Sequence, residues 1–159
     1  MSLSIRSGGQ TGVDRGALDA AVARGIPYCG WCPAGGWAED LGDPPGLLAH
    51  YQLTPTPSAR PEQRSAWNVR DSDATLVLID EAGGPSPGTQ FTIVCAELVF
   101  AKPFLVINLA DERARERALE WLGEQLVAHP NGFVLNIAGP RESEAPGIYA
   151  AAKGFVETL

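Results

Sequence analysis

The first thirty residues contain a strand, a helix and a second strand in close succession. Leu3 to Ile5 is a short apolar run typical of a strand, and apolar residues at helical spacing follow from Val13 to Ala21. Gly25 and Pro27 then end the helical pattern, and Ile26 to Trp31 has the composition of the next strand. Units of this kind have parallel strands and a right-handed crossover. This opening therefore restricts the chain to an α/β architecture.

The alternation of strands and helices continues to the end of the chain. The run Ala-Thr-Leu-Val-Leu-Ile at 74–79 is typical of a parallel strand that helices cover on both faces. The segment Thr89–Ala101 is apolar nearly all round, which predicts a buried helix. The 159 residues suffice for one domain with a substantial core. We predict a three-layer α/β fold with a doubly wound parallel sheet, as a single domain over residues 1–159, with further strands at Tyr51–Leu53, Phe104–Leu109 and Phe133–Ala138 and further helices at Glu62–Val69, from Asp111 and from Pro146.

A glycine-rich turn, Ser7 to Gly16, joins the first strand to the first helix. Its glycines allow a ligand to approach the backbone, and the first N–H groups of a helix lack partners within that helix, so a phosphate suits this position. The spacing matches neither the dinucleotide-binding fingerprint nor the P-loop, and a tight turn without a ligand fits it too. The polar side chains of Gln10, Thr11 and Arg15 favour the phosphate site. Asp14 suits two roles, favouring the helix dipole or binding a ligand hydroxyl or ring N–H.

Two further polar turns follow predicted strands. Gly83 to Thr89 opens a helix, and Gly139 to Ser143 follows the last strand. In an open parallel sheet the ligand crevice lies outside the carboxyl ends of the strands, at the switch point, which fits these turns. Arg141 either binds a ligand or pairs with a neighbouring carboxylate. Arg60, Arg64 and Asn68 share a helix face, which is either solvated or supplies cations to the pocket. The long loop from Pro33 to Gly46 is either functional or a flexible insertion.

The overall charge and the cysteines exclude some functions. A net charge of −7 argues against a nucleic-acid polymer or an anionic membrane as the main partner. No apolar run approaches the ~20 residues of a membrane span, and no secretory pattern opens the chain, so we expect a cytoplasmic protein. Cys29 and Cys32 fit redox chemistry, half of a zinc site or simple packing. We expect packing, because the remaining soft ligands, Cys95, His50 and His129, lack paired spacing.

No Ser-His-Asp or Cys-His grouping has a recognisable spacing, which favours a binding site over a reaction centre. The chain resembles the molybdenum cofactor carrier family, part of a wider group of Rossmann-like nucleotide-binding proteins that includes the LOG phosphoribohydrolases. The resemblance covers nearly the full length. It rests on the segments Ser7–Gly16, Cys29–Pro33 with Gly36, Ala38, Glu39 and Asp40, Arg64 with Asn68-Val69, Asp71–Ala74, Gly88-Thr89, and Asn136–Arg141.

This resemblance implies a Rossmann-like fold, a homo-oligomer (dimer or tetramer) and binding of molybdenum cofactor, a pyranopterin that carries one phosphate and a dithiolene-held molybdenum. Molybdenum enzymes or cofactor-synthesis proteins would then be partners. The sequence departs from the family at Thr54, where an acidic residue is expected, and in the Pro-rich segment 54–61. The predicted cofactor-binding residues are Gly8, Gly9, Gln10, Thr11, Gly12, Asp14, Arg15, Gly36, Arg64, Asn68, Gly84, Gly88, Thr89, Thr92, Asn108, Gly139 and Arg141, and we predict neither a catalytic residue nor a metal ligand from the protein.

The rival prediction is an enzyme. LOG proteins cleave the N-glycosidic bond of nucleoside monophosphates with a P-G-G-x-G-T-x-x-E turn whose Glu does acid/base or electrostatic work. Here Gly88-Thr89-Gln90-Phe91 is followed by Thr92, so the carboxylate that would stabilise an oxocarbenium-like centre is missing at its place. Glu97 lies almost two turns further on. Binding without turnover is therefore favoured, and a sensor of a nucleotide-derived signal would use the same pocket.

Overall fold

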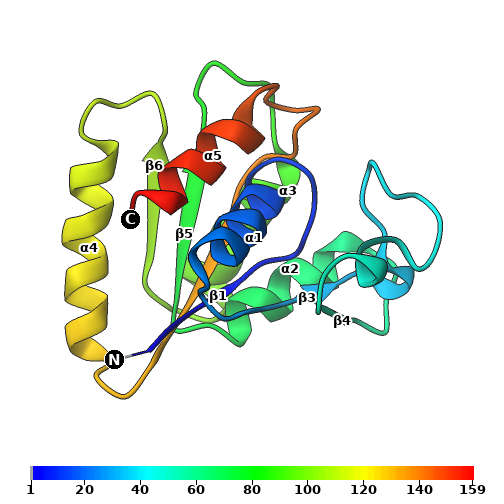
Figure 1. Ribbon diagram of the computed structural model, residues 1–159, viewed down its shortest axis with the longest axis horizontal. Helices are drawn as coiled ribbons and strands as arrows, with labels where there is room; N and C mark the ends of the chain where they lie inside the picture. The colour runs from blue at the N-terminus through cyan, green and yellow to red at the C-terminus, as the bar shows by residue number, and fades with distance from the viewer. Residues whose placement is uncertain (1) are drawn as a thin grey trace.

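The computed structural model describes residues 2–159, in which five parallel strands form a central sheet with the order β2-β1-β7-β5-β6 (Figure 1). Strand β7 therefore lies between β1 and β5, although it is the last strand of the chain, and β6 is an edge strand. This order places the carboxyl ends of β1, β7 and β5 side by side. The strands are β1 (Leu3–Arg6), β2 (Tyr28–Cys29), β5 (Ala74–Ile79), β6 (Phe104–Asn108) and β7 (Phe133–Ala138).

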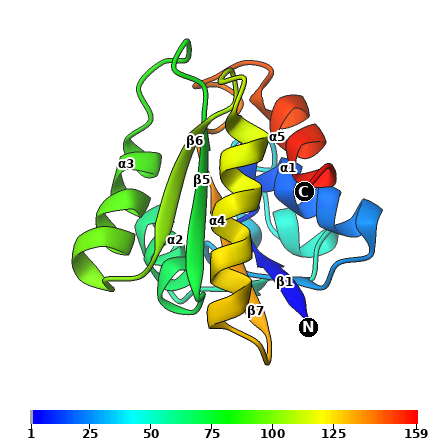
Figure 2. The same cartoon turned by 90° about the vertical axis from the view of Figure 1, so that its left-hand side faces the viewer.

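Helices cover both faces of this sheet (Figure 2). One face packs against α1 (Val13–Arg24), α4 (Ala114–Ala128) and α5 (Ile148–Glu157), and the other against α2 (Pro61–Arg70) and α3 (Pro87–Val94). The three-layer, doubly wound α/β fold predicted from the sequence is confirmed. No helix of residues 2–159 is both long and apolar enough to cross a membrane.

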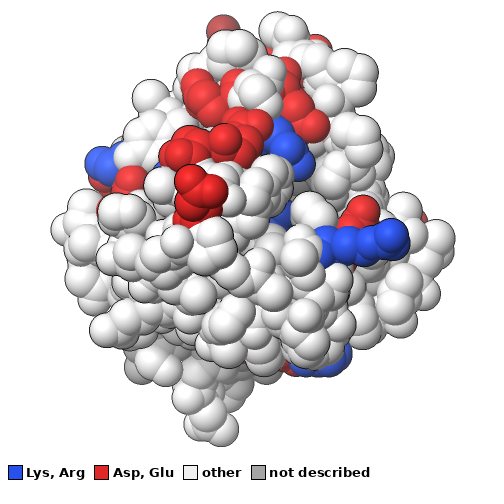
Figure 3. Space-filling model, turned by 90° about the vertical axis from the view of Figure 1, so that its right-hand side faces the viewer, with Lys and Arg blue, Asp and Glu red and all other residues white. Residues whose placement is uncertain are grey.

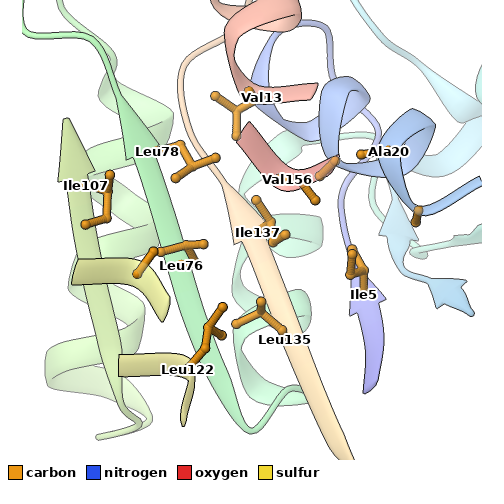
Figure 4. Packing of buried hydrophobic residues seen from close by; sticks show 14 of the residues in the cluster. Ile5, Val13, Ala20, Leu76, Leu78, Ile107, Leu122, Leu135, Ile137 and Val156 are labelled. Atoms are coloured by element: carbon orange, nitrogen blue, oxygen red, sulfur yellow. The ribbon is translucent and has the colours of Figure 1, made fainter. Parts of the chain in front are cut away.

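The larger core fills the space between the sheet and α1, α4 and α5 (Figure 4). Alternate residues of neighbouring strands supply it, because successive side chains of a strand point to opposite faces. Leu76 and Leu78 of β5 face Leu135 and Ile137 of β7, and all four are at most 2% exposed. Burying one such side chain contributes about 1.5–3 kcal/mol, so this layer fixes the sheet on which the strand ends converge.

The strand predicted at Ile26–Trp31 divides at Gly30. This glycine has φ +155°, and a Cβ there would lie 1.9 Å from the carbonyl oxygen of Ser7. Beyond it the chain leaves the central sheet, and β3 (Trp31–Cys32) pairs in parallel with β4 (Thr54–Pro55) in a small second sheet. The strand predicted at Tyr51–Leu53 is therefore wrong, because the paired residues begin at Thr54.

The loop after β3 is packed rather than flexible. It contains two 3₁₀ turns, η1 (Ala34–Gly36) and η2 (Gly46–Ala49). Leu47 of η2 is fully buried in a small second core with Leu18 of α1 and Cys32 of β3. The loop is thereby held against α1, next to the glycine-rich turn that precedes this helix.

The helix predicted to be buried over Thr89–Ala101 differs in two ways. Helix α3 ends at Val94 and continues as a π-helical turn, η3 (Cys95–Val99). Only one side of this segment packs against α2, and the side that includes Val94, Leu98 and Val99 is 45–73% exposed. The prediction of full burial is wrong for this side, because the segment lies in the outer layer of the fold.

Candidate functional site

A small cavity opens where the carboxyl ends of β1, β5 and β7 meet. Its volume is about 50 Å³, a size that suits one phosphate-sized anion. The turns after these three strands and the inner face of α2 surround it. The lining residues are Gly8, Gln10, Asp14, Arg64, Ser65, Asn68, Ser86, Gly88, Thr89, Thr92, Asn136, Ile137, Ala138, Gly139, Arg141 and Glu144.

Two helices begin at this cavity. Helix α3 starts with Pro87, which has no N–H, and the next two residues, Gly88 and Thr89, both line the cavity. The first N–H groups of a helix have no acceptor within the helix and attract anions. Helix α1 starts beside the turn after β7, where Val13 N donates a hydrogen bond to Pro140 O at 3.2 Å. At Gly12 (φ +77°) a Cβ would lie 2.3 Å from this same oxygen, so only glycine fits the approach.

Arg64 brings a buried positive charge to the cavity from α2. The residue is 6% exposed, and its Nη1 donates to Gly8 O at 3.0 Å while its Nε donates to Pro61 O at 3.4 Å. Burial lowers the pKa of the guanidinium and the nearby Asp14 carboxyl opposes this, but an arginine stays protonated in a protein. Of the two roles considered for the shared face of α2, the structure supports the pocket: Arg64 and Asn68 line the cavity, whereas Arg60 is exposed.

Asp14 places a carboxyl group in the same cavity. It is the second residue of α1, is 9% exposed, and its Oδ2 lies 4.0 Å from Arg64 Nη1. Burial raises the pKa of this carboxyl from 3.8 to about 6, against the opposing effects of Arg64, the Gln10 N–H, Arg15 and Arg141. The cavity therefore combines cationic and backbone donors with one carboxyl that titrates just below neutral pH.

Gln10 has a buried donor with nothing to bind. Its Oε1 accepts hydrogen bonds from Thr11 N at 3.0 Å and Glu39 N at 2.9 Å, which fixes the orientation of the amide. Its Nε2 is buried and has no hydrogen-bond partner in residues 2–159, although the residue is only 5% exposed. A buried unpaired donor is costly, so this amide points to an acceptor that a ligand would bring to the cavity.

A larger hollow of about 810 Å³ lies on the other side of two of the turns. In the first turn Gln10 lines the cavity and Thr11 lines the hollow. In the turn after β7, Arg141 and Glu144 line the cavity, whereas Glu142 and Ser143 line the hollow. Glu39 closes the wall here: its carboxylate accepts hydrogen bonds from Thr11 Oγ1, from Ser143 N at 3.2 Å and from Ser143 Oγ at 2.6 Å. Asp and Glu side chains gather in the upper part of one face of the molecule, next to Lys or Arg side chains (Figure 3).

The hollow is lined by paired polar groups. The Arg15 guanidinium makes two hydrogen bonds to the Asp40 carboxylate, at 2.9 and 2.8 Å. The hydroxyls of Tyr51 and Tyr149 both donate to the carboxylate of Asp19. These contacts hold two aromatic rings and one guanidinium at the edge of the hollow, which suits a ring-containing ligand better than a bare anion.

The predicted binding residues divide into three groups. Ten line the cavity: Gly8, Gln10, Asp14, Arg64, Asn68, Gly88, Thr89, Thr92, Gly139 and Arg141. Thr11, Gly12 and Arg15 line the hollow instead. Gly9, Gly36, Gly84 and Asn108 line neither space.

These four residues have other positions. Gly9 packs against Leu47, Gly36 lies against the backbone of η2, and Gly84 N donates to Glu144 O at 2.8 Å. Asn108 lies at the end of the edge strand β6, where its Oδ1 accepts a hydrogen bond from Ala110 N at 3.1 Å.

Four polar residues of the cavity are missing from the prediction: Ser65, Ser86, Asn136 and Glu144. Asn136 of β7 is 2% exposed and donates to Thr75 Oγ1 at 3.3 Å, and a polar residue inside a buried strand is the signal that identifies it. Ser86 and Glu144 bind each other across two turns at 2.9 Å. Only the packing of the turns reveals this pair.

The possible metal ligands of residues 2–159 do not cluster, and the cysteines are free thiols. No group of three or more His, Cys, Asp or Glu side chains in this part of the chain suits a metal ion. Cys29 and Cys32 are free thiols, and burial raises the pKa of Cys32. Cys32 lies in the second core, as the packing interpretation predicts.

Thr92, which the resemblance to LOG proteins predicts at the place of their glutamate, forms a hydrogen bond within its own helix. Thr92 Oγ1 donates a hydrogen bond to Gly88 O at 3.1 Å, within helix α3. Thr92 lines the cavity but supplies no charge there.

The sequence of residues 5–159 matches the circularly permutated YpsA SLOG family. The chain belongs to this family. A solved structure from Syntrophus aciditrophicus, named "Putative molybdenum carrier protein", is 42% identical to this chain and has a TM-score of 0.81, with 97% of this chain and 92% of that chain covered. No curated protein matches the sequence. The Rossmann-like SLOG fold and the resemblance to molybdenum carrier proteins are thereby confirmed.

Proposed function

We propose that this protein binds molybdenum cofactor as a cargo and holds the phosphate of the cofactor in the cavity at the ends of β1, β5 and β7. The observation that carries the proposal is the buried, unpartnered Nε2 of Gln10 beside the buried guanidinium of Arg64. Both groups are donors, and both lie at a cavity of phosphate size at which two helices begin. The name of the solved relative, a molybdenum carrier, supports the choice of cargo.

The rest of the cofactor needs more room than the cavity offers. Sites for ring-sized ligands have volumes of about 300–1,000 Å³, and the hollow with Tyr51 and Tyr149 falls in this range. A phosphate in the cavity and a pterin in the hollow would share the wall formed by Thr11, Glu39 and Ser143. The loaded protein would then store the cofactor or deliver it to molybdenum enzymes.

The test is calorimetric titration with inorganic phosphate and with cofactor released from a molybdenum enzyme. Gly88→Asp places a carboxylate at the mouth of the cavity without a steric clash, because a Cβ at Gly88 meets nothing within 4 Å. We expect this variant to lose affinity for both ligands at least tenfold, since like charges repel in a confined site. Gln90→Asp, on the exposed side of the same helix turn, is the matched control and should bind as the wild type does. Equal affinities of the wild type and Gly88→Asp would refute the site.

A further inference from the structure

Asp14 puts a carboxyl group into a cavity that is otherwise built for an anion. The donors around the cavity include Arg64, Arg141, the Gln10 amide and the start of α3. An ionised carboxylate in so small a space repels an incoming oxyanion, and two like charges in one site cannot both ionise freely. The donors explain why the cavity would bind an anion, but they do not explain why a carboxyl group lies among them.

The surroundings of Asp14 hold it in place: the Gln10 N–H favours its ionised form, but no side chain of residues 2–159 donates a hydrogen bond to its carboxyl group. Arg64 of α2 lies 4.0 Å away, beyond hydrogen-bond distance. A Cβ added to Gly8 would lie 2.9 Å from Arg64 Nη1 and 3.0 Å from Asp14 Oδ2, so backbone, guanidinium and carboxyl pack against one another. The guanidinium of Arg15 binds Asp40 instead.

The remaining charges near Asp14 come from the turn after β7. Arg141 lines the cavity and is within 4.0 Å of both Glu39 and Glu144. Glu144 Oε1 accepts hydrogen bonds from Ser86 Oγ and Arg141 N. Asp14 is thus the one carboxyl of the cavity that no hydrogen bond from another side chain satisfies in residues 2–159.

We infer that the cavity takes up an oxyanion together with one proton, held between the ligand and Asp14, and that it therefore prefers a phosphate group to sulfate or molybdate near neutral pH. This inference rests on the proposed phosphate site. A phosphate monoanion brings the proton as its own P–O–H group, which donates to the Asp14 carboxylate. Sulfate and molybdate are fully ionised at this pH, so their proton must come from the solvent and sit on Asp14, which then donates to the anion.

The chemistry of the two groups agrees with this assignment. A phosphomonoester loses its last proton with a pKa of about 6. Burial raises the pKa of Asp14 to about 6, so the Asp14 carboxylate and the phosphate bind the proton with nearly equal affinity. One proton between two acidic groups removes the repulsion that two full charges would cause. Molybdenum would accordingly enter this cavity as part of a phosphate-bearing cofactor, not as free molybdate.

Sulfate is the diagnostic probe, because it does not titrate in the range in which Asp14 does. We expect calorimetry to show that the affinity of the wild type for sulfate falls about 50-fold between pH 6 and pH 8, because the neutral fraction of Asp14 falls from about one half to about one hundredth. Titrations at pH 8 in buffers of different ionisation enthalpy should show one proton taken up per sulfate bound. Phosphate should bind more tightly than sulfate at pH 7.

The variant Asp14→Asn should bind sulfate with the same affinity at both pH values, without proton uptake, and should lose the preference for phosphate. Asp43→Asn, which removes an exposed carboxylate, should behave as the wild type does. The proton count on the wild type needs no variant, so the inference stays testable if Asp14→Asn fails to fold. Sulfate binding that is independent of pH in the wild type would overturn the inference. Failure of both anions to bind at pH 6 would instead overturn the phosphate site itself.

Discussion

Replacing Asp14 by asparagine should stabilise the protein when no ligand is bound. The folded state raises the pKa of Asp14 from 3.8 to about 6, so ionisation of this carboxyl opposes folding. At about 1.4 kcal/mol per pH unit the difference corresponds to about 3 kcal/mol. Asparagine is neutral in both states and avoids this cost, so the gain at pH 8 is about 3 kcal/mol.

The sign of this effect fixes its dependence on pH. Below the unfolded pKa the carboxyl is neutral in both states, so the variant and the wild type should be equally stable at pH 3.5. As the pH rises through the interval from 3.8 to about 6, the wild type loses stability that Asp14→Asn keeps. Above this interval the difference stays constant. For a chain of this length it corresponds to a rise in Tm of roughly 6–12 °C.

Urea unfolding at pH 3.5, 5 and 8 in a buffer without phosphate or sulfate tests the reasoning. Bound anions would stabilise the folded state and hide the effect, so a non-coordinating buffer is essential. An unchanged m-value would show that the denatured state is the same. A variant that is less stable than the wild type at pH 8 would refute the argument, because it would mean that Arg64 stabilises an ionised Asp14 at their separation of 4.0 Å.

Three other predictions follow from the described residues. The double change Cys29→Ser with Cys32→Ser should leave the affinity for phosphate unchanged, because Cys32 only packs in the second core, and should lower the free energy of unfolding by roughly 1 kcal/mol. A stoichiometric zinc ion or a readily formed disulfide in the wild type would contradict this prediction. Chromatography should detect no free base from AMP, because Thr92 offers no carboxylate; release at enzyme-like rates would contradict it. Light scattering should show a homo-oligomer that Leu98→Glu dissociates, because Leu98 is 73% exposed beside Val99; a monomeric wild type would contradict it.

The sequence predicts the layers of this fold well because periodicity and turn chemistry are local. The first strand, the turn of residues 7–16 and helix α1 lie where the pattern of apolar residues and glycines predicts them. Burial of the α3 segment is not local, since it depends on whether a neighbouring layer covers each side. Leu98 looks like a core residue in the sequence and is exposed because α2 contacts only the other side.

The order of the strands explains why the structure places Asn136, and not the predicted Asn108, at the cavity. Asn108 and Asn136 both lie in or at the end of a strand that precedes a polar turn, and nothing local separates them. Strand β6 is at the edge of the sheet, whereas β7 lies between β1 and β5. Only Asn136 therefore reaches the cavity. The pairing of strands that are distant in the chain decides which turns meet, and a single sequence does not contain that information.

The circular permutation of the family bears on the comparison with LOG enzymes. The LOG turn is matched to residues 84–92 by local sequence alone, and a circular permutation changes the order of such turns along the chain. The structure brings two glycine-rich turns, before α1 and before α3, to a single cavity. One carboxyl group of this cavity comes from α1, at Asp14, within the first turn of the helix. Thr92 thus leaves the start of α3 without a carboxyl group, whereas Asp14 places one at the start of α1, 4.0 Å from Arg64. The same variant, Asp14→Asn, consequently serves both questions, since it removes the group that would hold a shared proton for a bound phosphate and the group that would carry any hydrolysis.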